Sequence, residues 1–269
     1  MALTINTNMS SLIVQKNLNA ATSMLNKSIE RMTTGYKINH AADNAAGYSI
    51  ATTWKTQLGS LDVASDNAST GADMLTTLED TYSLITSHLQ RVRDLTEQAA
   101  NGTYGSDSLK AIASEITARL EEIDRISANC EFNGLKMMDG SLTDDINLQV
   151  GLYSDAASRI ALDASLFQNG HVSALFKTFG GVGGATVAEV AKLCSGYDGK
   201  QITGGQNEML NKIDAVISEI SARTTTLGAA QNRIESAVES INVQSENITS
   251  SLSTLRDADV AEESSNYIK

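Results

Sequence analysis

The fold of this chain is decided by the stretch LNKIDAVISEISARTTTLGAAQNRIESAVESINVQSENITSSLSTL, residues 210–255. Its large apolar residues recur at alternating spacings of three and four, which returns them to one face of an α-helix. A continuous helix over this stretch would be about 70 Å long. The stretch therefore predicts a coiled-coil-like seam that includes Leu210, Ile213, Ile217, Ile220, Ile234, Ile241 and Ile248.

The first half of the chain repeats this spacing over residues 61–99. Small residues occupy the beginning of the repeat, where helices could approach closely. A third helix is expected over residues 106–129, and an earlier amphipathic stretch covers residues 18–32. The seam residues singled out in the first long helix are Leu75, Leu78, Ile85 and Leu89.

The composition favours long helices over an ordinary globular core. The chain has 269 residues, no Pro and only 4% aromatic residues. Because Pro is the strongest helix breaker, its absence permits long uninterrupted helices. Single helices with apolar seams need partners, since packing and not propensity stabilises most of them. We therefore predict a mainly α fold, an elongated antiparallel rod in which N- and C-terminal helices pack together.

Between the helical halves the pattern changes. The runs INLQVGLY (146–153) and SRIALD (158–163) alternate apolar and polar residues and are separated by Ser-Asp-Ala-Ala, which predicts a β-hairpin. Residues 168–206 are Gly-rich and irregular and read as a surface insertion with one short helix at 185–194.

The charge of the chain limits its partners. A formal net charge of −12 argues against nucleic acid, because phosphate binding needs a basic surface. No basic stretch flanks an apolar segment, and no window approaches a membrane span, so a membrane partner is not expected. The N-terminus lacks the features of a cleaved signal peptide, which leaves a cytoplasmic protein or one exported without cleavage.

No combination of residues predicts catalysis, a cofactor or a metal ion. His40, His88 and His171 lie far apart in the sequence and do not have paired-ligand spacing. GGVGGAT (180–186) lacks the Lys-Ser/Thr of a phosphate-binding loop. Cys130 and Cys194 read as small buried apolar residues, although a disulfide between them stays open. We expect a protein that is not an enzyme.

Several long motifs, in the same order along the chain, resemble bacterial flagellin, the self-assembling subunit of the flagellar filament. The resemblance covers most of the chain. It rests on MALTINTNMSSLIVQKNLN (1–19), SIERMTTGYKINHAADNAAGYSIA (28–51), LQRVRDLTEQAANGT (89–103), ISANCEFNGLKMMDG (126–140), LGAAQNRIESAVESI (227–241) and LRDADVAEESSNYIK (255–269).

The resemblance implies a domain organisation. Residues 1–43 would form an inner-core and export segment, and residues 44–167 the N-terminal part of the rod with a β-hairpin at about 136–165. The variable region would be reduced to residues 168–203. Residues 204–256 would form the C-terminal rod helix, and 257–269 the start of the C-terminal inner-core helix.

The resemblance also implies partners and a location. A flagellin forms a homopolymer, is bound by an export chaperone and is secreted through the flagellar type III apparatus to the extracellular filament. Family members continue into an apolar C-terminal helix, so we expect this chain to lack that helix and to polymerise poorly. Residues 1–40 would then lack a partner within the chain, and we expect them to be disordered until assembly.

One stripe does not fit the seam of the first long helix. Leu95 lies between Arg91 and Gln98, away from Leu89 and Val92. It either packs against the predicted third helix or is an exposed apolar contact with a polar rim, as at protein–protein hot spots. In flagellins this surface contacts a host Toll-like receptor and neighbouring subunits, so the resemblance favours the second interpretation. The implied contact residues are Arg91, Leu95, Gln98 and Glu115.

Two other classes of protein remain open at this stage. A hook–filament junction protein would share the terminal pattern without extensive polymerisation. A non-catalytic helical scaffold would share the periodicity alone. The RVRDL, ANGT and QNRIESA motifs favour flagellin over the junction protein. The terminal pairing and the export-like N-terminus weigh against the scaffold.

Overall fold

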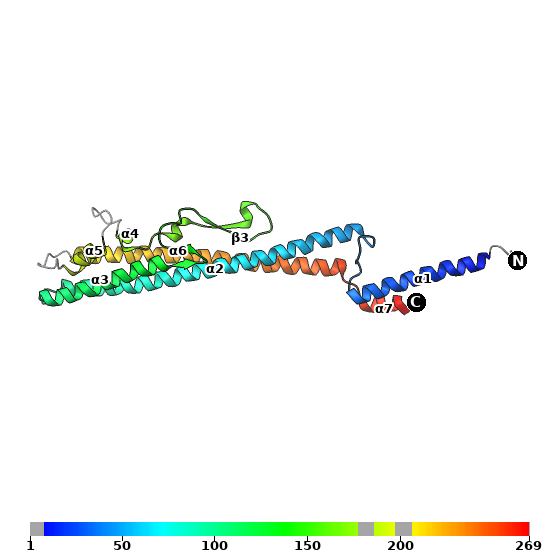
Figure 1. Cartoon of the computed structure of the whole chain (residues 1–269), viewed down its shortest axis with the longest axis horizontal. Helices are drawn as coiled ribbons and strands as arrows, with labels where there is room; N and C mark the ends of the chain where they lie inside the picture. The colour runs from blue at the N-terminus through cyan, green and yellow to red at the C-terminus, as the bar shows by residue number, and fades with distance from the viewer. Residues whose placement is uncertain (1–7, 177–185, 197–205, 269) are drawn as a thin grey trace. The chain divides into compact units, whose positions relative to one another are not determined.

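A computed structural model of the chain describes residues 8–176, 186–196 and 206–268 (Figure 1). The expected mainly α fold with long helices is confirmed. The chain divides into two units: residues 1–63 with 241–269, and residues 64–240. The elements are α1 (Met9–Thr34), α2 (Ala45–Ala100), α3 (Ser106–Asn129), β1 (Glu131–Phe132), β2 (Leu135–Lys136), β3 (Ile146–Gln149), η1 (Ala156–Ser158), β4 (Arg159–Leu162), η2 (Ala164–Phe167), α4 (Val172–Leu175), α5 (Val187–Ser195), α6 (Gln206–Arg256) and α7 (Val260–Ile268).

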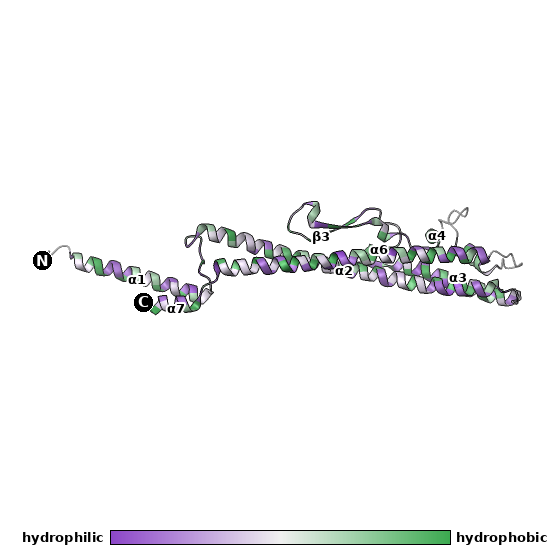
Figure 2. Ribbon diagram, turned by 180° about the vertical axis from the view of Figure 1, so that it is seen from behind, coloured by the Kyte–Doolittle hydropathy of each residue, from purple (hydrophilic) through white to green (hydrophobic). Residues whose placement is uncertain are grey.

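In the unit of residues 64–240, α2 and α6 run antiparallel and α3 lies along α2 (Figures 1 and 2). Two polar contacts fix the pairing of α2 with α6. The Arg93 guanidinium contacts both carboxylate oxygens of Asp214, at 2.5 and 3.3 Å. Further along, the Gln231 side-chain amide donates to Glu79 Oε2 at 2.9 Å. Partner numbers rise on one helix as they fall on the other, as antiparallel packing requires.

The seam predicted for α2 is buried along its length, and Leu75, Leu78, Ile85 and Leu89 are all inaccessible to solvent. A second buried stripe lies beside this seam and consists of Met74, Thr81 and Leu95. Cys130, which directly follows α3, donates from its thiol to the Thr81 hydroxyl at 3.4 Å. The second stripe therefore belongs to the face of α2 that receives α3, whose own apolar residues are buried at Leu109, Ile112, Ile116, Leu120 and Ile123.

The predicted seam of α6 consists of two alternating series of residues. The residues of one series are buried as predicted up to Ile241, whereas in the other series the buried residue is the one that precedes the predicted residue. Ile213, Ile220, Ile234 and Ile241 are buried, whereas Leu210, Ile217 and Ile248 are half-buried. Met209, Val216 and Ala230 are buried in place of their predicted neighbours.

The predicted hairpin is confirmed, but β3 ends at Gln149 and not at residue 153, so the connection is longer than the predicted Ser-Asp-Ala-Ala turn and includes η1. β3 and β4 pair antiparallel, with Ile146 opposite Leu162 and Gln149 opposite Arg159. Leu148 of β3 packs against α2 at Gly71, where an added Cβ would collide with Leu148 Cδ1. A small residue in the seam of α2 thus makes room for the hairpin.

A second, shorter hairpin joins β1 to β2 and was not predicted. Asn133 and Gly134 form its two-residue turn with φ angles of 49° and 82°. Asn-Gly is the dipeptide that such turns prefer, because both central residues need positive φ.

The Gly-rich insertion is described only in part. Residues 177–185 and 197–205 lie outside the described residues, and GGVGGAT falls almost entirely there. The short helix expected at 185–194 is α5, at Val187–Ser195. It begins with a capping box in which Thr186 and Glu189 each accept from the other's backbone N–H.

The expectation that the C-terminal helix is missing is wrong. Helix α7 packs along α1 in the unit of residues 1–63 and 241–269, with Glu263 3.6 Å from Arg31. Asp259 caps α7 by accepting from the Ala261 backbone N–H at 2.8 Å. The C-terminal half of α1, which lines a groove with α7, therefore has a partner within the chain. Met9–Thr34 form a helix that ends at Gly35 with φ 73°.

Both cysteines are free and buried, which settles the open disulfide in favour of two thiols. Burial raises the pKa of the Cys194 thiol to about 12, and burial likewise raises the pKa of Cys130. The thiolate is the reactive form of cysteine, and a raised pKa keeps both thiols protonated in mildly alkaline buffer. A thiol reagent in such a buffer is therefore expected to leave the native protein unlabelled. In denaturant without reductant, both thiols should label, as counted by mass spectrometry. Absence of labelling there would reveal a disulfide instead.

Candidate functional site

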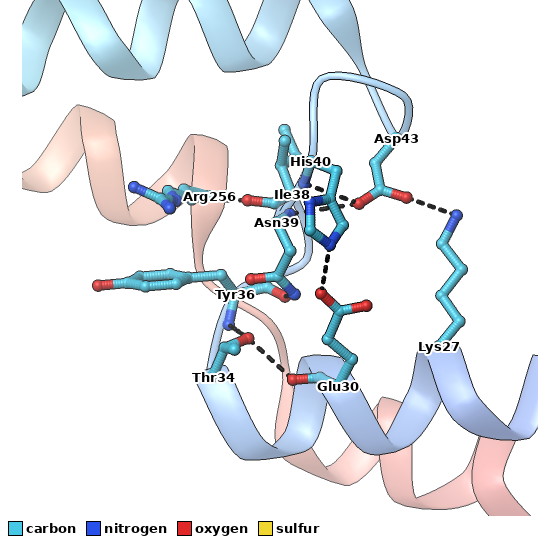
Figure 3. Close-up of polar contacts among 9 residues, drawn as sticks. All are labelled: Lys27, Glu30, Thr34, Tyr36, Ile38, Asn39, His40, Asp43 and Arg256. Atoms are coloured by element: carbon cyan, nitrogen blue, oxygen red, sulfur yellow. Dashed lines mark hydrogen bonds and ion pairs between the residues drawn. The ribbon is translucent and has the colours of Figure 1, made fainter.

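The connection between α1 and α2, residues 35–44, meets the connection between α6 and α7 (Figure 3). Tyr36 and Asp257 form an antiparallel β-bridge. The Lys37 N–H donates to the Arg256 carbonyl at 2.7 Å, and the Ala258 N–H donates to the Gly35 carbonyl at 2.8 Å. The breaks between consecutive helices at the two ends of the chain are therefore tied by backbone hydrogen bonds.

Side chains strengthen this junction. Lys37 Nζ donates to the Thr254 carbonyl at 2.7 Å, which satisfies one of the unpaired carbonyls at the end of α6. The Arg256 guanidinium lies 4.2 Å from the centre of the Tyr36 ring, and its Nε donates to the Ile38 carbonyl at 3.3 Å. Cation–π stacking and the hydrogen bond hold the same cation, so Arg256 fixes the position of residues 36–38.

A second polar cluster folds residues 39–43 back onto α1 (Figure 3). Asp43 accepts from the backbone N–H groups of Asn39 and His40, at 3.3 and 3.2 Å, and contacts Lys27 Nζ at 2.6 Å. His40 Nε2 lies 2.7 Å from Glu30 Oε1. The Asp43 side chain is 12% exposed, and its Lys27 contact, followed by the two backbone donors, lowers its pKa from 3.8 to about 2.

This cluster should respond to acid. Because the pKa of Asp43 is lower in the folded protein, its stabilisation is complete above the ordinary value of 3.8 and is lost as pH falls through about 2. The amide NMR signals of Asn39 and His40 are expected to shift with a midpoint near 2. Lys27→Met should move that midpoint towards 3.8. A midpoint at or above 3.8 in the unaltered chain would contradict the assigned contacts.

The surface of α1 is unusually apolar for an exposed helix, and Figure 2 shows hydrophobic residues along its length. Large apolar side chains with high exposure occur from its first turn to its last. An open groove of about 720 Å³ runs between α1 and α7 and is lined in part by Met24, Leu25 and Tyr267. Contiguous exposed apolar surface marks an interaction site. The exposed residues are Met9, Leu12, Ile13, Val14, Leu18, Met24, Leu25, Ile29 and Met32 on α1, and Val260, Tyr267 and Ile268 on α7.

The predicted contact stripe on α2 is only partly exposed. Arg91 and Gln98 are exposed, and Arg91 Nε donates to Glu115 Oε1 of α3 at 3.0 Å. Gln98 donates to the Tyr104 hydroxyl at 3.0 Å. Leu95, in contrast, is 2% exposed, so the expectation of an exposed apolar contact is wrong for this residue. Its burial agrees with the alternative, in which it packs towards α3.

Two sequence models match most of the helical chain. The bacterial flagellin N-terminal helical region matches residues 5–143, and the bacterial flagellin C-terminal helical region matches residues 210–269. The chain belongs to the bacterial flagellin family. The second match covers α7, so the C-terminal helical region of the family extends to the end of the described chain.

Curated flagellins support this membership. Flagellin FlaB1 of Treponema pallidum (strain Nichols) is 30% identical over 270 residues, which cover 98% of this chain and 90% of that protein. Phase 1 flagellin of Salmonella naestved is 40% identical over 204 residues, or 76% of this chain. The match spans only 39% of the Salmonella flagellin.

Solved structures share the fold. The crystal structure of Bacillus cereus flagellin has a TM-score of 0.50 at 24% identity, over 70% of this chain and 94% of that one. A putative flagellar hook-associated protein from Vibrio parahaemolyticus has a TM-score of 0.66 at 12% identity, over 80% of this chain and 100% of that one. The fold is thus common to flagellin and a hook-associated protein.

Flagellins are structural proteins, and the described part of this chain presents helix surfaces suited to packing, such as the apolar surface of α1. Among the described residues, no group of three or more His, Cys, Asp or Glu side chains is placed to hold a metal ion. Within the same segments, no helix combines the length and apolarity needed to cross a membrane.

Sequence reasoning missed the residues of the helix junction. Asp43 and Asn44 precede α2, and Asn44 Oδ1 accepts from the Gly47 N–H at 2.9 Å, so an N-cap signal was present. Arg256 and Tyr36 are 220 residues apart, and no local pattern reveals that they meet.

Proposed function

We propose that this flagellin-family chain is the repeating subunit of a flagellar filament and serves motility. The observation that carries the proposal is the apolar surface of α1, where Leu18 is 64% exposed and Met24 is 73% exposed. Such a surface is unfavourable in water and becomes favourable when copies of the chain cover it. The groove between α1 and α7 offers a place for an apolar ridge of another subunit.

Electron microscopy of the purified chain under polymerising conditions tests this proposal. Helical filaments that lengthen with protein concentration are the expected result. Persistent monomers, with circular dichroism showing intact helices, would contradict it. They would favour a hook–filament junction protein, since a hook-associated protein has the same fold.

The proposal includes export through the flagellar type III apparatus with the help of a chaperone, and therefore secretion. The two exposed helices α1 and α7 support this route, because a chaperone that covers them would prevent premature association. Deletion of residues 1–43 is expected to abolish secretion by a flagellated host while the remaining chain accumulates inside the cell.

We also propose that a host Toll-like receptor recognises the α2–α3 surface, through Arg91, Gln98 and Glu115. Support comes from the exposure of Arg91 and from its pairing with Glu115 on the neighbouring helix. Leu95 is not part of this proposal as a contact, because it is buried.

Charge reversal tests the receptor proposal. Arg91→Asp is expected to weaken binding to an immobilised receptor ectodomain about 10- to 100-fold, because a charge-assisted contact is replaced by a repulsive one. Arg125→Asp is the matched control, since Arg125 lies on α3 and pairs within its own helix with Glu122. Equal losses for both variants would indicate non-specific electrostatics and contradict the proposal.

A further inference from the structure

Three Asn-Gly dipeptides occur in the described residues, and their environments differ. They are Asn101-Gly102, Asn133-Gly134 and Asn169-Gly170. Asn followed by Gly is chemically labile, because the glycine nitrogen can attack the side-chain carbonyl carbon without obstruction by a Cβ. Whether the attack occurs depends on access to that nitrogen and on freedom of the backbone.

Asn101 and Gly102 directly follow the last residue of α2, and both are exposed. None of the described residues accepts a hydrogen bond from the Gly102 N–H. The Thr103 N–H donates to Asn101 Oδ1 at 3.3 Å. This donor points at the oxygen on which negative charge develops when a nucleophile attacks Cγ, so it stabilises the tetrahedral intermediate.

Asn169-Gly170 has the opposite environment. Gly170 is buried, and its N–H donates to the Met138 carbonyl at 2.9 Å. Attack by this nitrogen requires that the hydrogen bond be broken first. Asn169 Oδ1 accepts from the His171 N–H at 2.8 Å, as Asn101 Oδ1 accepts from the Thr103 N–H. The two sites therefore differ in the glycine nitrogen, which, among the described residues, has a hydrogen-bond acceptor at Gly170 and none at Gly102.

Asn133-Gly134 is exposed but constrained. The two residues form the turn between β1 and β2, with φ angles of 49° and 82°. Pairing of Phe132 with Leu135 on either side holds this backbone conformation, which resists the rotation that would bring the Gly134 nitrogen to Cγ.

We propose that Asn101 is a site of spontaneous deamidation and isomerisation in this protein. The Gly102 nitrogen gives its proton to solvent base and forms a bond to Asn101 Cγ. The bond from Cγ to the side-chain nitrogen breaks, and that nitrogen leaves as ammonia. Water then opens the succinimide at either carbonyl and yields Asp or isoaspartate, with no change of oxidation state.

The product alters the end of α2. A carboxylate replaces a neutral amide beside the unpaired carbonyls of the helix C-terminus, where negative charge is unfavourable. Isoaspartate also adds a methylene to the main chain of the turn that leads into α3. The α2–α3 turn therefore changes charge and geometry as the protein ages, without an enzyme.

Incubation of the full chain in mildly alkaline buffer tests the proposal, with peptide mapping by mass spectrometry and isoaspartyl methyltransferase labelling. Asn101 is expected to lose its amide about tenfold faster than Asn169, which corresponds to one backbone hydrogen bond of about 1.4 kcal/mol. Asn133 should also be slower than Asn101. An Asn101 rate equal to or below that of either site would overturn the proposal.

Gly102→Ala provides a second measurement. A Cβ at Gly102 meets nothing within 4 Å, so the fold should be retained, as circular dichroism can verify. The added methyl hinders the attacking nitrogen and should slow loss of the Asn101 amide while leaving Asn169 unaffected. An unchanged Asn101 rate would show that the Gly102 nitrogen is not the nucleophile and would overturn the proposal.

Discussion

Replacing Leu95 with Ala is expected to lower the free energy of unfolding by about 2–5 kcal/mol, the range for truncating a buried Leu. The side chain is 2% exposed, and it lies on the stripe of α2 that faces α3, so its removal leaves a cavity between helices. Urea unfolding followed by circular dichroism measures the loss.

Gln98→Ala is the matched control for this prediction. It lies three residues further along α2, is exposed and makes a surface hydrogen bond to Tyr104. Its free energy of unfolding should change by no more than about 0.5 kcal/mol. A Leu95→Ala protein as stable as the Gln98→Ala protein would mean that Leu95 is not a core residue. Any loss of receptor binding in Leu95→Ala must therefore be corrected for lost structure before Leu95 is treated as a contact.

Leu95 also shows what a periodic pattern misses. The sequence predicted a single seam on α2, and that seam is buried, because a 3–4 spacing describes packing of two helices. A helix with two neighbours needs a wider apolar face. The additional positions recur every seven residues as Met74, Thr81, His88 and Leu95. Because two of these four residues are Thr and His, a count of apolar residues does not detect the series.

His88 shows that a polar residue can occupy that face. It is half-buried on the side of α2 that faces α3, and burial, together with the nearby positive charge of Arg119, lowers its pKa. Its Nδ1 is buried without a hydrogen-bond partner among the described residues, so placing this ring between helices carries a desolvation cost. No local pattern places this histidine there, because its neighbours on α3 are known only after α3 folds back.

The one-residue offset on α6 has a similar origin. Val216 and Ile217 are adjacent apolar residues, and either can continue a 3–4 repeat from Ile213. In the structure Val216 is buried. Asp214 pairs with Arg93 of α2, and at the start of α6 Gln206 donates to the carbonyl of Ser195, the last residue of α5. Tertiary contacts choose between two registers that the sequence supports equally.

Both hairpins, in contrast, carry local signals in the sequence. The β3–β4 hairpin followed from alternation, and the β1–β2 hairpin is encoded by Asn133-Gly134 although it was overlooked. The helix junction could not be predicted, since Tyr36 with Arg256 and Lys37 with Thr254 join residues more than 200 positions apart. Their pairing requires both ends of the chain to be placed first.

Replacing Leu18 with Asp is expected to raise the critical concentration for filament formation by about 10- to 100-fold. Burial of one Leu side chain contributes about 1.5–3 kcal/mol, and each 1.4 kcal/mol changes an association constant tenfold. An Asp at an interface adds a desolvation cost in the same direction. Because Leu18 is 64% exposed in the single chain, the substitution removes little packing within it.

Sedimentation of polymer at a series of protein concentrations measures the effect of Leu18→Asp. Asn19→Asp is the control, because it adds the same charge at the next residue of α1, in place of an exposed polar side chain. The two variants should have equal helical content, and Asn19→Asp should polymerise nearly as well as the unaltered chain. If neither variant polymerises, a negative charge added to α1 is enough to prevent polymerisation, and loss of the Leu18 side chain is not the cause. If neither fails, the apolar surface of α1 is not the assembly surface, and the proposed basis of filament formation is wrong.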